Sequence, residues 1–344
     1  MIMIKKIALR NFRGIAKGEI DLEPLTILVG PNNSGKTTIL EALLLAHGTR
    51  SIFDPYPGPS VLEILSEIHS TLDSKGLDHL IFTYGAQTDK AGILYQLENG
   101  RKFAWAINII GSRLLLRFSQ IDENITFDNL INDTSISGSP RVEITRFTSG
   151  FTYTPQKLLA NLLIYRYELI NEYQKFLYTA WIDLVNKGIS SKTAEWLSTV
   201  TEEKYTDLVA EPFGGKPSLS LYRSDKRRVR LGDVGDGIKI LTLIRMAFDL
   251  LNPDILLWDD IESHMNPRTL SLLAMWIADI TEKGKQAILT THSLEATRTL
   301  ASIAEKATII RLDLQNGQLN TKKYSIEDIE KLKDIGIDLS LIHI

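Results

Sequence analysis

Gly30-Pro31-Asn32-Asn33-Ser34-Gly35-Lys36-Thr37 decides the fold of this chain, because it is a complete G-x-x-x-x-G-K-[ST] phosphate loop. The apolar run 25–29 before it predicts a buried strand, and residues 37–46 predict a helix. An ordinary glycine-rich helix start is the alternative, which this strand–loop–helix context disfavours. Lys36 is expected to neutralise the β and γ phosphates of a nucleotide, and the Thr37 hydroxyl to bind Mg²⁺. The loop residues expected to contact the nucleotide are Asn32, Asn33, Ser34, Gly35, Lys36, Thr37 and Thr38.

Length and composition indicate an ordinary globular protein. The 344 residues are 44% hydrophobic, enough for one large α/β domain or two smaller ones. The 39 Lys and Arg against 42 Asp and Glu exclude the overall basic field of a dedicated nucleic-acid binder. The absence of cysteine excludes disulfides, thiolate metal sites and cysteine nucleophiles. No apolar run approaches a membrane span and the start lacks a signal peptide, so we expect a cytoplasmic protein without membrane association.

The first half of the chain predicts strands followed by helices. Residues 1–30 alternate as strands do, and a helical stretch is expected from about Val61. Further strands are expected at 80–84, 92–97 and 114–118, which predicts an antiparallel sheet. From about residue 156 apolar side chains recur at helical spacing, at Leu158, Leu162, Tyr165, Leu169, Tyr173, Phe176, Trp181 and Leu184. We interpret this stretch as a helical insertion.

The second half predicts alternating helices and strands, which form a parallel sheet covered by helices. The helices are expected over 237–251, 267–282 and 293–303, and the strands over 255–258, 286–290 and 307–312. The last of these strands is expected to be the final one. The fold class is therefore α/β, and the expected segments are 1–154, 155–204 (the helical insertion) and 205–344.

Polar side chains at two strand ends predict the rest of the nucleotide site. Asp259 directly follows the strand 255–258 and is expected in the Mg²⁺ shell, and Asp260 is expected to polarise the attacking water. Glu262 is a rival base two residues further on. His292 ends the next strand, where an imidazole can bond the γ-phosphate or that water. The alternative for each is a structural polar residue at a strand end.

Taken together, these motifs resemble the ABC-type ATPase superfamily, specifically the stand-alone heads related to SMC, RecF and OLD proteins. The resemblance rests on residues 11–13, 30–37, 235–239, 259–264 and 290–292, and residues 50–220 carry none of it. It implies a phosphate-loop parallel sheet with an N-terminal antiparallel β-subdomain. It also implies ATP and Mg²⁺ as ligands, and a head-to-tail homodimer.

By position in the family, several residues acquire expected roles. Gly235 and Gly237 would contact the ATP held by a partner subunit, and Arg13 would lie near the phosphates. Asp259 would bind Mg²⁺ and His292 would be the switch histidine. The loop that contains His264 and Asn266 would meet the partner subunit.

Three departures from the family pattern are visible. Gly235-Asp236-Gly237 stands where the family has Ser-Gly-Gly or Ser-x-Gly, so a serine contact to phosphate is missing. Asp260 stands at the position of the catalytic glutamate, which favours slow turnover. The glutamine that completes the Mg²⁺ shell is not identified, and Gln156 is a weak candidate.

The sequence indicates less about the molecule on which such an ATPase would act. Arg223, Lys226, Arg227, Arg228 and Arg230 could bind nucleic-acid phosphate, although a solvated hairpin edge is the favoured interpretation. The residues after about 315 are too few for a Toprim nuclease, so a nuclease or other effector is expected to be a separate chain.

Two functions remain open at this point. The first is an ATP-hydrolysing head that drives a DNA-repair or defence effector. The second is an ATP-gated clamp with little turnover, and an ABC transporter subunit is a weaker third.

Overall fold

A single large sheet forms the centre of the molecule. The structure is a computed structural model and describes residues 2–70, 76–111, 113–123, 125–132, 141–145, 159–199, 201–304 and 306–334. Within them, the sheet has the strand order β7-β6-β5-β4-β1-β2-β15-β14-β3-β13-β12-β8. The α/β fold class and the antiparallel N-terminal part are both confirmed.

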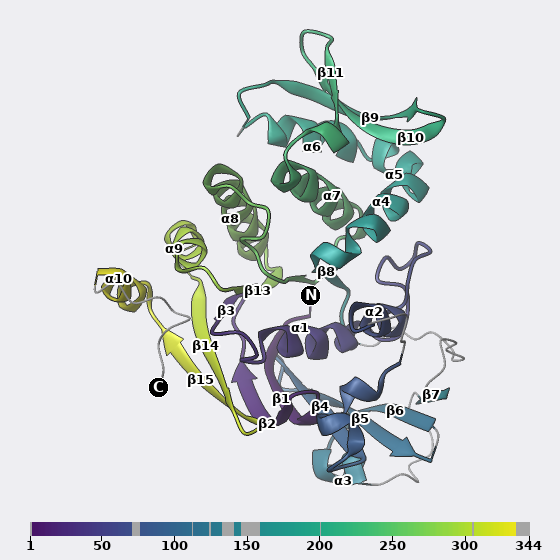
Figure 1. Ribbon diagram of the computed structural model, residues 1–344, viewed down its shortest axis with the longest axis vertical. Helices are drawn as coiled ribbons and strands as arrows, with labels where there is room; N and C mark the ends of the chain where they lie inside the picture. The colour runs from purple at the N-terminus through teal and green to yellow at the C-terminus, as the bar shows by residue number, and fades with distance from the viewer. Residues whose placement is uncertain are drawn as a thin grey trace.

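Antiparallel strands make up one end of the sheet, as the alternating N-terminal sequence predicts (Figure 1). They are β1 (Ile4–Phe12), β2 (Ile15–Asp21), β4 (Lys90–Leu97), β5 (Lys102–Ile110), β6 (Arg113–Ile121) and β7 (Arg141–Thr145). The short helix α3 (Phe127–Asn132) packs against β4 and β5. This end belongs to the same sheet as the phosphate loop.

Parallel strands make up the other end of the sheet. They are β3 (Leu25–Val29), β8 (Leu162–Tyr165), β12 (Ile255–Trp258), β13 (Gln286–Thr291) and β14 (Thr308–Gln315). The first four are buried at every position, because helices cover both faces of the sheet. One face carries α1 (Lys36–Leu44), and the other carries α7 (Asp236–Leu251), α8 (Pro267–Glu282) and α9 (Leu294–Ile303) (Figure 1).

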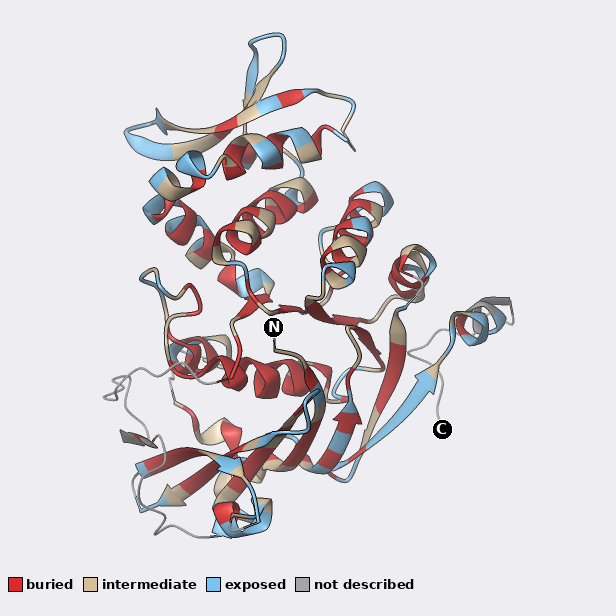
Figure 2. Cartoon of the chain, turned by 180° about the vertical axis from the view of Figure 1, so that it is seen from behind, coloured by how far each residue is buried: buried red, intermediate tan, exposed pale blue. Residues whose placement is uncertain are grey.

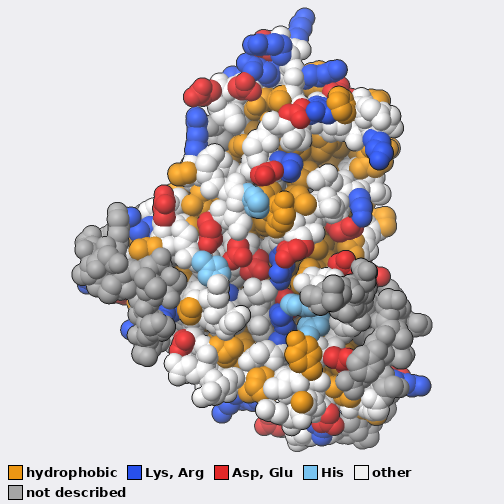
Figure 3. Space-filling view, in the orientation of Figure 1, with side chains coloured by type: hydrophobic (Ala, Val, Ile, Leu, Met, Phe, Trp, Pro, Cys, Tyr) orange, Lys and Arg blue, Asp and Glu red, His pale blue; other side chains and the backbone are white. Residues whose placement is uncertain are grey.

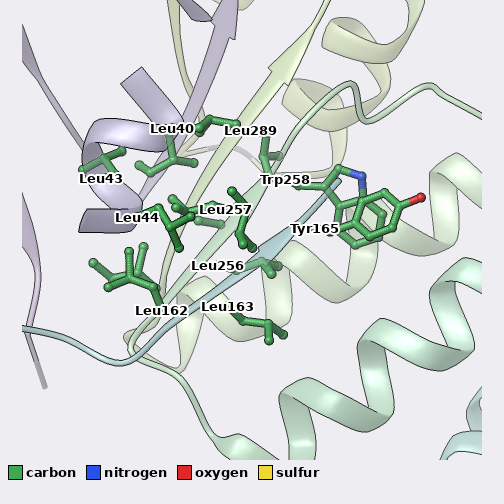
Figure 4. Packing of buried hydrophobic residues seen from close by; sticks show 14 of the residues in the cluster. Leu40, Leu43, Leu44, Leu162, Leu163, Tyr165, Leu256, Leu257, Trp258 and Leu289 are labelled. Carbon is green, nitrogen blue, oxygen red and sulfur yellow. The ribbon is translucent and has the colours of Figure 1, made fainter. Parts of the chain in front are cut away.

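The helix α1 is anchored on the sheet by its leucines. Leu40, Leu43 and Leu44 are at most 1% exposed, and Leu44 lies beside Leu162 and Leu257 of the sheet (Figure 4). Each buried leucine stabilises the fold by roughly 1.5–3 kcal/mol. Red, buried positions extend through α1 and the sheet in Figure 2. The helix that carries the end of the phosphate loop is therefore fixed on the sheet.

The helical insertion is confirmed in part. It contains α4 (Ile170–Thr179), α5 (Trp181–Asn186) and α6 (Ile189–Leu197), which pack on α7. The helical interpretation is wrong for residues 162–165, which form β8 beside β12. A short run buried on every side has no helical or strand periodicity to distinguish the two. Leu158 and Gln156 lie outside the described residues.

A second, three-stranded sheet follows the insertion and covers α6. Its strands are β9 (Tyr205–Phe213), β10 (Lys216–Arg223) and β11 (Arg228–Arg230), in the order β11-β10-β9. With α4–α7 they form the upper lobe in Figure 1.

Two further expectations are wrong. Residues 80–84 are not a strand but lie in the short 3-10 turns η2 (Asp78–Leu80) and η3 (Phe82–Gly85), where Thr83 and Tyr84 have positive φ. Only Ile81 makes a bridge, to Phe12 of β1. The strand after α9 is not the last, because β15 (Gln318–Tyr324) and α10 (Ile326–Asp334) follow it.

The remaining elements are short. The helix α2 (Val61–Ile68) starts at Ser60 with a reciprocal capping box to Glu63, as helix starts often do. The other 3-10 turns are η1 (Leu45–His47), η4 (Tyr167–Leu169) and η5 (Leu231–Asp233). Across the described ranges we find no helix with the length and apolarity needed to cross a membrane.

Candidate nucleotide site

Four strand ends meet at one edge of the parallel sheet. The loop 30–37 follows β3, Asp259 follows β12, His292 follows β13 and Arg166 follows β8. Ligand sites in open α/β sheets form at the carboxyl ends of the strands. Acidic, basic and histidine side chains gather across the middle of the face in Figure 3. The structure thus brings together the phosphate loop and both predicted strand-end groups.

The phosphate loop is closed around the Lys36 side chain. Its Nζ donates to the carbonyl oxygens of Gly30 at 2.8 Å and Pro31 at 2.9 Å. Burial lowers the pKa of Lys36 to about 8, although the charges of Asp260, Asp259 and Glu262 oppose the shift. Gly30 has φ +146°, and a Cβ there would lie 2.5 Å from the Leu312 carbonyl oxygen. Only glycine fits this position.

Thr37 and Asp259 place oxygen atoms side by side beneath the loop. The Thr37 hydroxyl lies 3.2 Å from Asp259 Oδ2, and the buried Thr290 hydroxyl donates to Asp259 Oδ1 at 2.7 Å. A hydroxyl and a carboxylate are the oxygen ligands that Mg²⁺ prefers, so these two residues fit the ion and would hold it. Bound there, Mg²⁺ would offset phosphate charge. Within the described residues no group of three or more His, Cys, Asp or Glu forms a ready-made metal cage.

The two candidate bases, Asp260 and Glu262, have different surroundings. The Asp260 side chain is 48% exposed, and its Oδ1 lies 3.5 Å from His292 Nε2. Burial, followed by the charge of Asp259, raises the pKa of Asp260. Glu262 instead accepts the backbone N–H of His292 through Oε1 at 2.7 Å. The Asp260 carboxylate is therefore accessible to solvent, whereas the Glu262 carboxylate holds the backbone at the end of β13.

His292 lies between the lysine and the aspartate. Its Nδ1 is 3.4 Å from Lys36 Nζ, and its Nε2 is 3.5 Å from Asp260 Oδ1. Because a protonated lysine only donates and a carboxylate only accepts, the neutral tautomer that suits both neighbours has its hydrogen on Nε2.

Arg13 is joined to a buried acid that the sequence did not single out. It pairs with Glu41 of α1, which is 0% exposed and also bonds His69 Nε2 at 2.9 Å. Burial alone would raise the pKa of Glu41, but the His69 hydrogen bond and the charges of Arg13 and Arg166 hold it below its usual value. Arg13 also lines a cavity of about 510 Å³, together with His79 and Tyr84.

The glycine-rich turn 235–237 lies apart from the phosphate loop. In the part of the chain that the structure describes, no hydrogen bond or ion pair joins it to residues 30–37. Gly235 is exposed and a Cβ there would lie in open space, whereas Gly237 is buried and a Cβ there would lie 2.8 Å from the His264 carbonyl oxygen. Asp236 pairs with Lys239 at 2.8 Å.

The loop after Asp260 packs close to this turn. The exposed His264 ring stacks on Tyr167 with centroids 4.5 Å apart, and its Nδ1 lies 3.8 Å from Asp236 Oδ2. Asn266 caps α8 by accepting the Thr269 N–H at 2.9 Å. The predicted partner-facing residues thus lie beside the turn 235–237.

The most important residue that sequence reasoning missed is Arg166. Its guanidinium lies 3.6 Å from Asp259 Oδ2 and 3.2 Å from Glu41 Oε1. The available signal was a polar residue directly after an apolar run, the same signal that indicated Asp259. The helical interpretation of residues 162–165 concealed it.

The basic segment 223–230 forms the hairpin between β10 and β11 and its ends. Its arginines are paired with nearby carboxylates: Arg223 with Glu203, Arg227 with Asp225, Arg228 with Glu211 and Arg230 with Asp233. Lys226 lies in the turn with φ +65°. The hairpin-edge interpretation agrees with this geometry, and the arginine charge is largely offset locally.

Comparison with known proteins identifies the family. Residues 25–297 match the model of the family described as "AAA domain, putative AbiEii toxin, Type IV TA system". The chain belongs to this family. A Helicobacter pylori protein named ATP/GTP phosphatase is 26% identical over 327 residues, covering 85% of this chain and 86% of that protein.

Two further similarities are a short stretch of sequence and an overall fold. An OLD nuclease from Thermus scotoductus is 48% identical over 46 residues, which is 13% of this chain and 9% of that protein. The Smc head domain from Pyrococcus furiosus superposes with a TM-score of 0.58 at 15% identity, covering 98% of this chain and 100% of that one. Together these findings support the expected assignment, an ABC-type ATPase head of the SMC/RecF/OLD-like group.

Proposed function

We propose that the protein hydrolyses ATP in a two-fold homodimer that forms around Mg²⁺ and ATP, and that turnover is slow. The observation that carries the proposal is the separation of two half-sites on one chain. Lys36, Thr37, Asp259, Asp260 and His292 meet at one edge, while Gly235 stands exposed and unconnected to them. A second copy in two-fold arrangement supplies the missing half to each site.

The chemistry follows from the positions of the side chains. Lys36 and the loop N–H groups hold the β and γ phosphates, and Thr37 and Asp259 would hold Mg²⁺. Asp260 accepts a proton from water. The water oxygen attacks the γ-phosphorus, and the bond between that phosphorus and the oxygen that leaves with ADP breaks. His292, fixed through its backbone by Glu262, orients the water or the γ-phosphate.

The short side chain at position 260 supports slow turnover. An aspartate carboxylate lies one methylene further back than a glutamate would, and a misplacement of about 1 Å can cost roughly a hundredfold in rate. Such an enzyme keeps its ATP dimer for long periods. We propose that this long-lived dimer acts on a separate DNA-repair or defence effector.

The decisive experiment measures hydrolysis and mass together. Phosphate release from ATP should require Mg²⁺ and vanish in Lys36→Ala. Light scattering should give the mass of a dimer with a non-hydrolysable ATP analogue and that of a monomer without it. An unchanged mass would contradict the dimer, and dimerisation without any phosphate release would favour the ATP-gated clamp.

A further inference from the structure

Arg166 occupies the strand end next to the metal-binding aspartate. β8 and β12 are parallel, with Tyr165 in register with Trp258, and the Asp259 N–H donates to the Tyr165 carbonyl oxygen at 3.0 Å. Arg166 and Asp259 are therefore the next residues on two neighbouring strands. The Arg166 side chain is only 12% exposed, so it is directed into the site edge rather than into solvent.

Three carboxylates surround this guanidinium. Its NH1 lies 3.2 Å from Glu41 Oε1 and 3.6 Å from Asp259 Oδ2, and its NH2 lies 3.2 Å from Glu168 Oε1. The planar fork of an arginine holds several acceptors in one fixed geometry, whereas the ammonium of a lysine is a point charge on a flexible stem. Glu41 is itself fixed in α1 and bonded to Arg13 and His69. The anchor of Arg166 therefore belongs to the rigid helix behind the phosphate loop.

The Asp259 carboxylate is held from both sides. Thr290 donates to Oδ1, and Oδ2 lies between the Thr37 hydroxyl and Arg166. Among the described residues, Arg166 is the one cation that forms an ion pair with Asp259. A fixed positive charge beside a metal ligand disfavours a free divalent cation there, and the phosphates of ATP offset that repulsion.

We propose that Arg166 is a positioning residue of the nucleotide site: anchored on Glu41 and Glu168, it orients Asp259 and excludes divalent cations until nucleotide is bound. The inference rests on the proposed ATPase function. In the family a glutamine completes the Mg²⁺ shell, and the sequence does not reveal one in this chain. The inference assigns the place next to Asp259 to Arg166 instead.

The test compares Arg166→Gln and Arg166→Lys with the parent, using Mn²⁺ as the paramagnetic probe of the metal site. Without nucleotide, Arg166→Gln should bind Mn²⁺ about three- to tenfold more tightly, because the repelling charge is gone. Its kcat should fall roughly tenfold through misorientation of Asp259, while KM for ATP changes less than about twofold. Arg166→Lys should be intermediate in both quantities, since it keeps the positive charge but lacks the planar fork that fixes several carboxylates in one geometry.

Arg50→Gln is the matched control, since it removes another arginine–aspartate pair, with Asp54, on a more exposed side chain. It should leave Mn²⁺ affinity and kcat unchanged. Thermal melting identifies a variant that fails to fold, and Arg166→Lys then carries the test. Parent-like Mn²⁺ affinity and kcat in a folded Arg166→Gln or Arg166→Lys would overturn the proposal.

The outcomes separate this inference from the proposed function. If the parent releases phosphate and Arg166→Gln matches it in both quantities, the role of Arg166 is wrong and the ATPase stands. If the parent releases no phosphate but Arg166→Gln still binds Mn²⁺ more tightly, the ATPase proposal fails and the exclusion of cations by Arg166 stands.

Discussion

Two glycine-rich turns open helices in this chain, and only the first is surrounded by the other side chains of the candidate nucleotide site. We call the first the finished turn and the second the unfinished turn. The loop 30–37 opens α1 and the turn 235–237 opens α7, so each presents free backbone N–H groups at a helix N-terminus. Around the first turn the chain places Lys36, Asp259 and His292. Beside the second, Asp236 pairs with Lys239, and a Cβ added at the exposed Gly235 would meet no described atom within 4 Å apart from its chain neighbours.

The difference lies in what the fold brings to each turn. The first turn follows a central strand, so the ends of β12, β13 and β8 deliver side chains to it. The second turn begins a helix of the upper lobe and follows β11 and η5, so no strand of the large sheet leads into it (Figure 1). A helix N-terminus is therefore not sufficient for a nucleotide site. The surrounding strand ends decide which turn is expected to bind nucleotide without a second subunit.

Lys36→Ala tests the finished turn and should have the largest effect. Its Nζ is the only cation expected on the β and γ phosphates from within the loop, and charge-assisted hydrogen bonds contribute roughly 1.5–3 kcal/mol each. ATP affinity, measured by calorimetry on the folded variant, should fall at least about 100-fold. Lys239→Ala removes the lysine in the first turn of α7 and should change monomer affinity less than about twofold. Equal losses in the two variants would erase the distinction between the turns.

Asp260→Asn should have the next largest effect, on the chemical step. Removal of a general base lowers rates by roughly a hundredfold, while the amide preserves the shape of the side chain. Single-turnover hydrolysis checks this. Because burial and the charge of Asp259 raise the pKa of Asp260, the parent should lose activity towards acid pH as this carboxylate takes up a proton.

Glu262→Gln is the matched variant for the second acid. The amide oxygen of glutamine can still accept the His292 N–H, so hydrolysis should fall only severalfold. Loss of activity in Glu262→Gln with an unaffected Asp260→Asn would exchange the roles of the two acids.

Gly235→Arg tests the unfinished turn. Open space around Gly235 lets the monomer accept a side chain, whereas a side chain at Gly237 would meet the chain's own backbone. With an ATP analogue, the dissociation constant of the dimer should rise at least about tenfold, because the side chain blocks the approach of the partner. Gly232→Arg adds the same side chain three residues earlier, also in open space, and should dimerise as the parent does. A dimer that tolerates Gly235→Arg would place the partner's contact elsewhere.

Elements whose structure depends on local chemistry could be predicted from the sequence alone. The loop, the strand before it and Asp259 were predictable, because glycines, a lysine and a strand-end acid have one common arrangement. Residues 162–165 were not, because a strand buried on both faces lacks any periodicity. That error hid Arg166, whose role depends on which strand lies beside β12.

Long-range pairing also explains the other failures. Glu41 reads as an ordinary residue of an amphipathic helix, and only the fold surrounds it with Arg13, Arg166 and His69. Residues 80–84 look like a strand by composition, yet they curl into 3-10 turns against β1. Such contacts join residues 28 or more positions apart, as the 28 positions between Arg13 and Glu41 and the 125 between Glu41 and Arg166 illustrate.

The pH dependence of ATP binding provides the last test of the finished turn. Burial lowers the pKa of Lys36 to about 8 in the free protein, so its ammonium is present below that pH and is lost above it. Phosphate needs the charged form, and bound ATP should therefore raise the pKa of Lys36. Each binding event then takes up about half a proton at pH 8 and close to one at pH 9, and affinity should fall about tenfold between pH 7 and pH 9.

Lys36→Arg separates this effect from the other groups that face the lysine, namely Asp259, Asp260, Glu262 and His292. A guanidinium stays protonated throughout this range, so the variant should bind ATP with a flat pH profile whatever its absolute affinity. Calorimetry in two buffers with different ionisation enthalpies counts the protons directly. A flat profile in the parent, or the same fall in Lys36→Arg, would show that Lys36 is not the titrating group. The two turns would then differ only in the strand ends that surround them, and the charge of the buried lysine would not contribute to the difference.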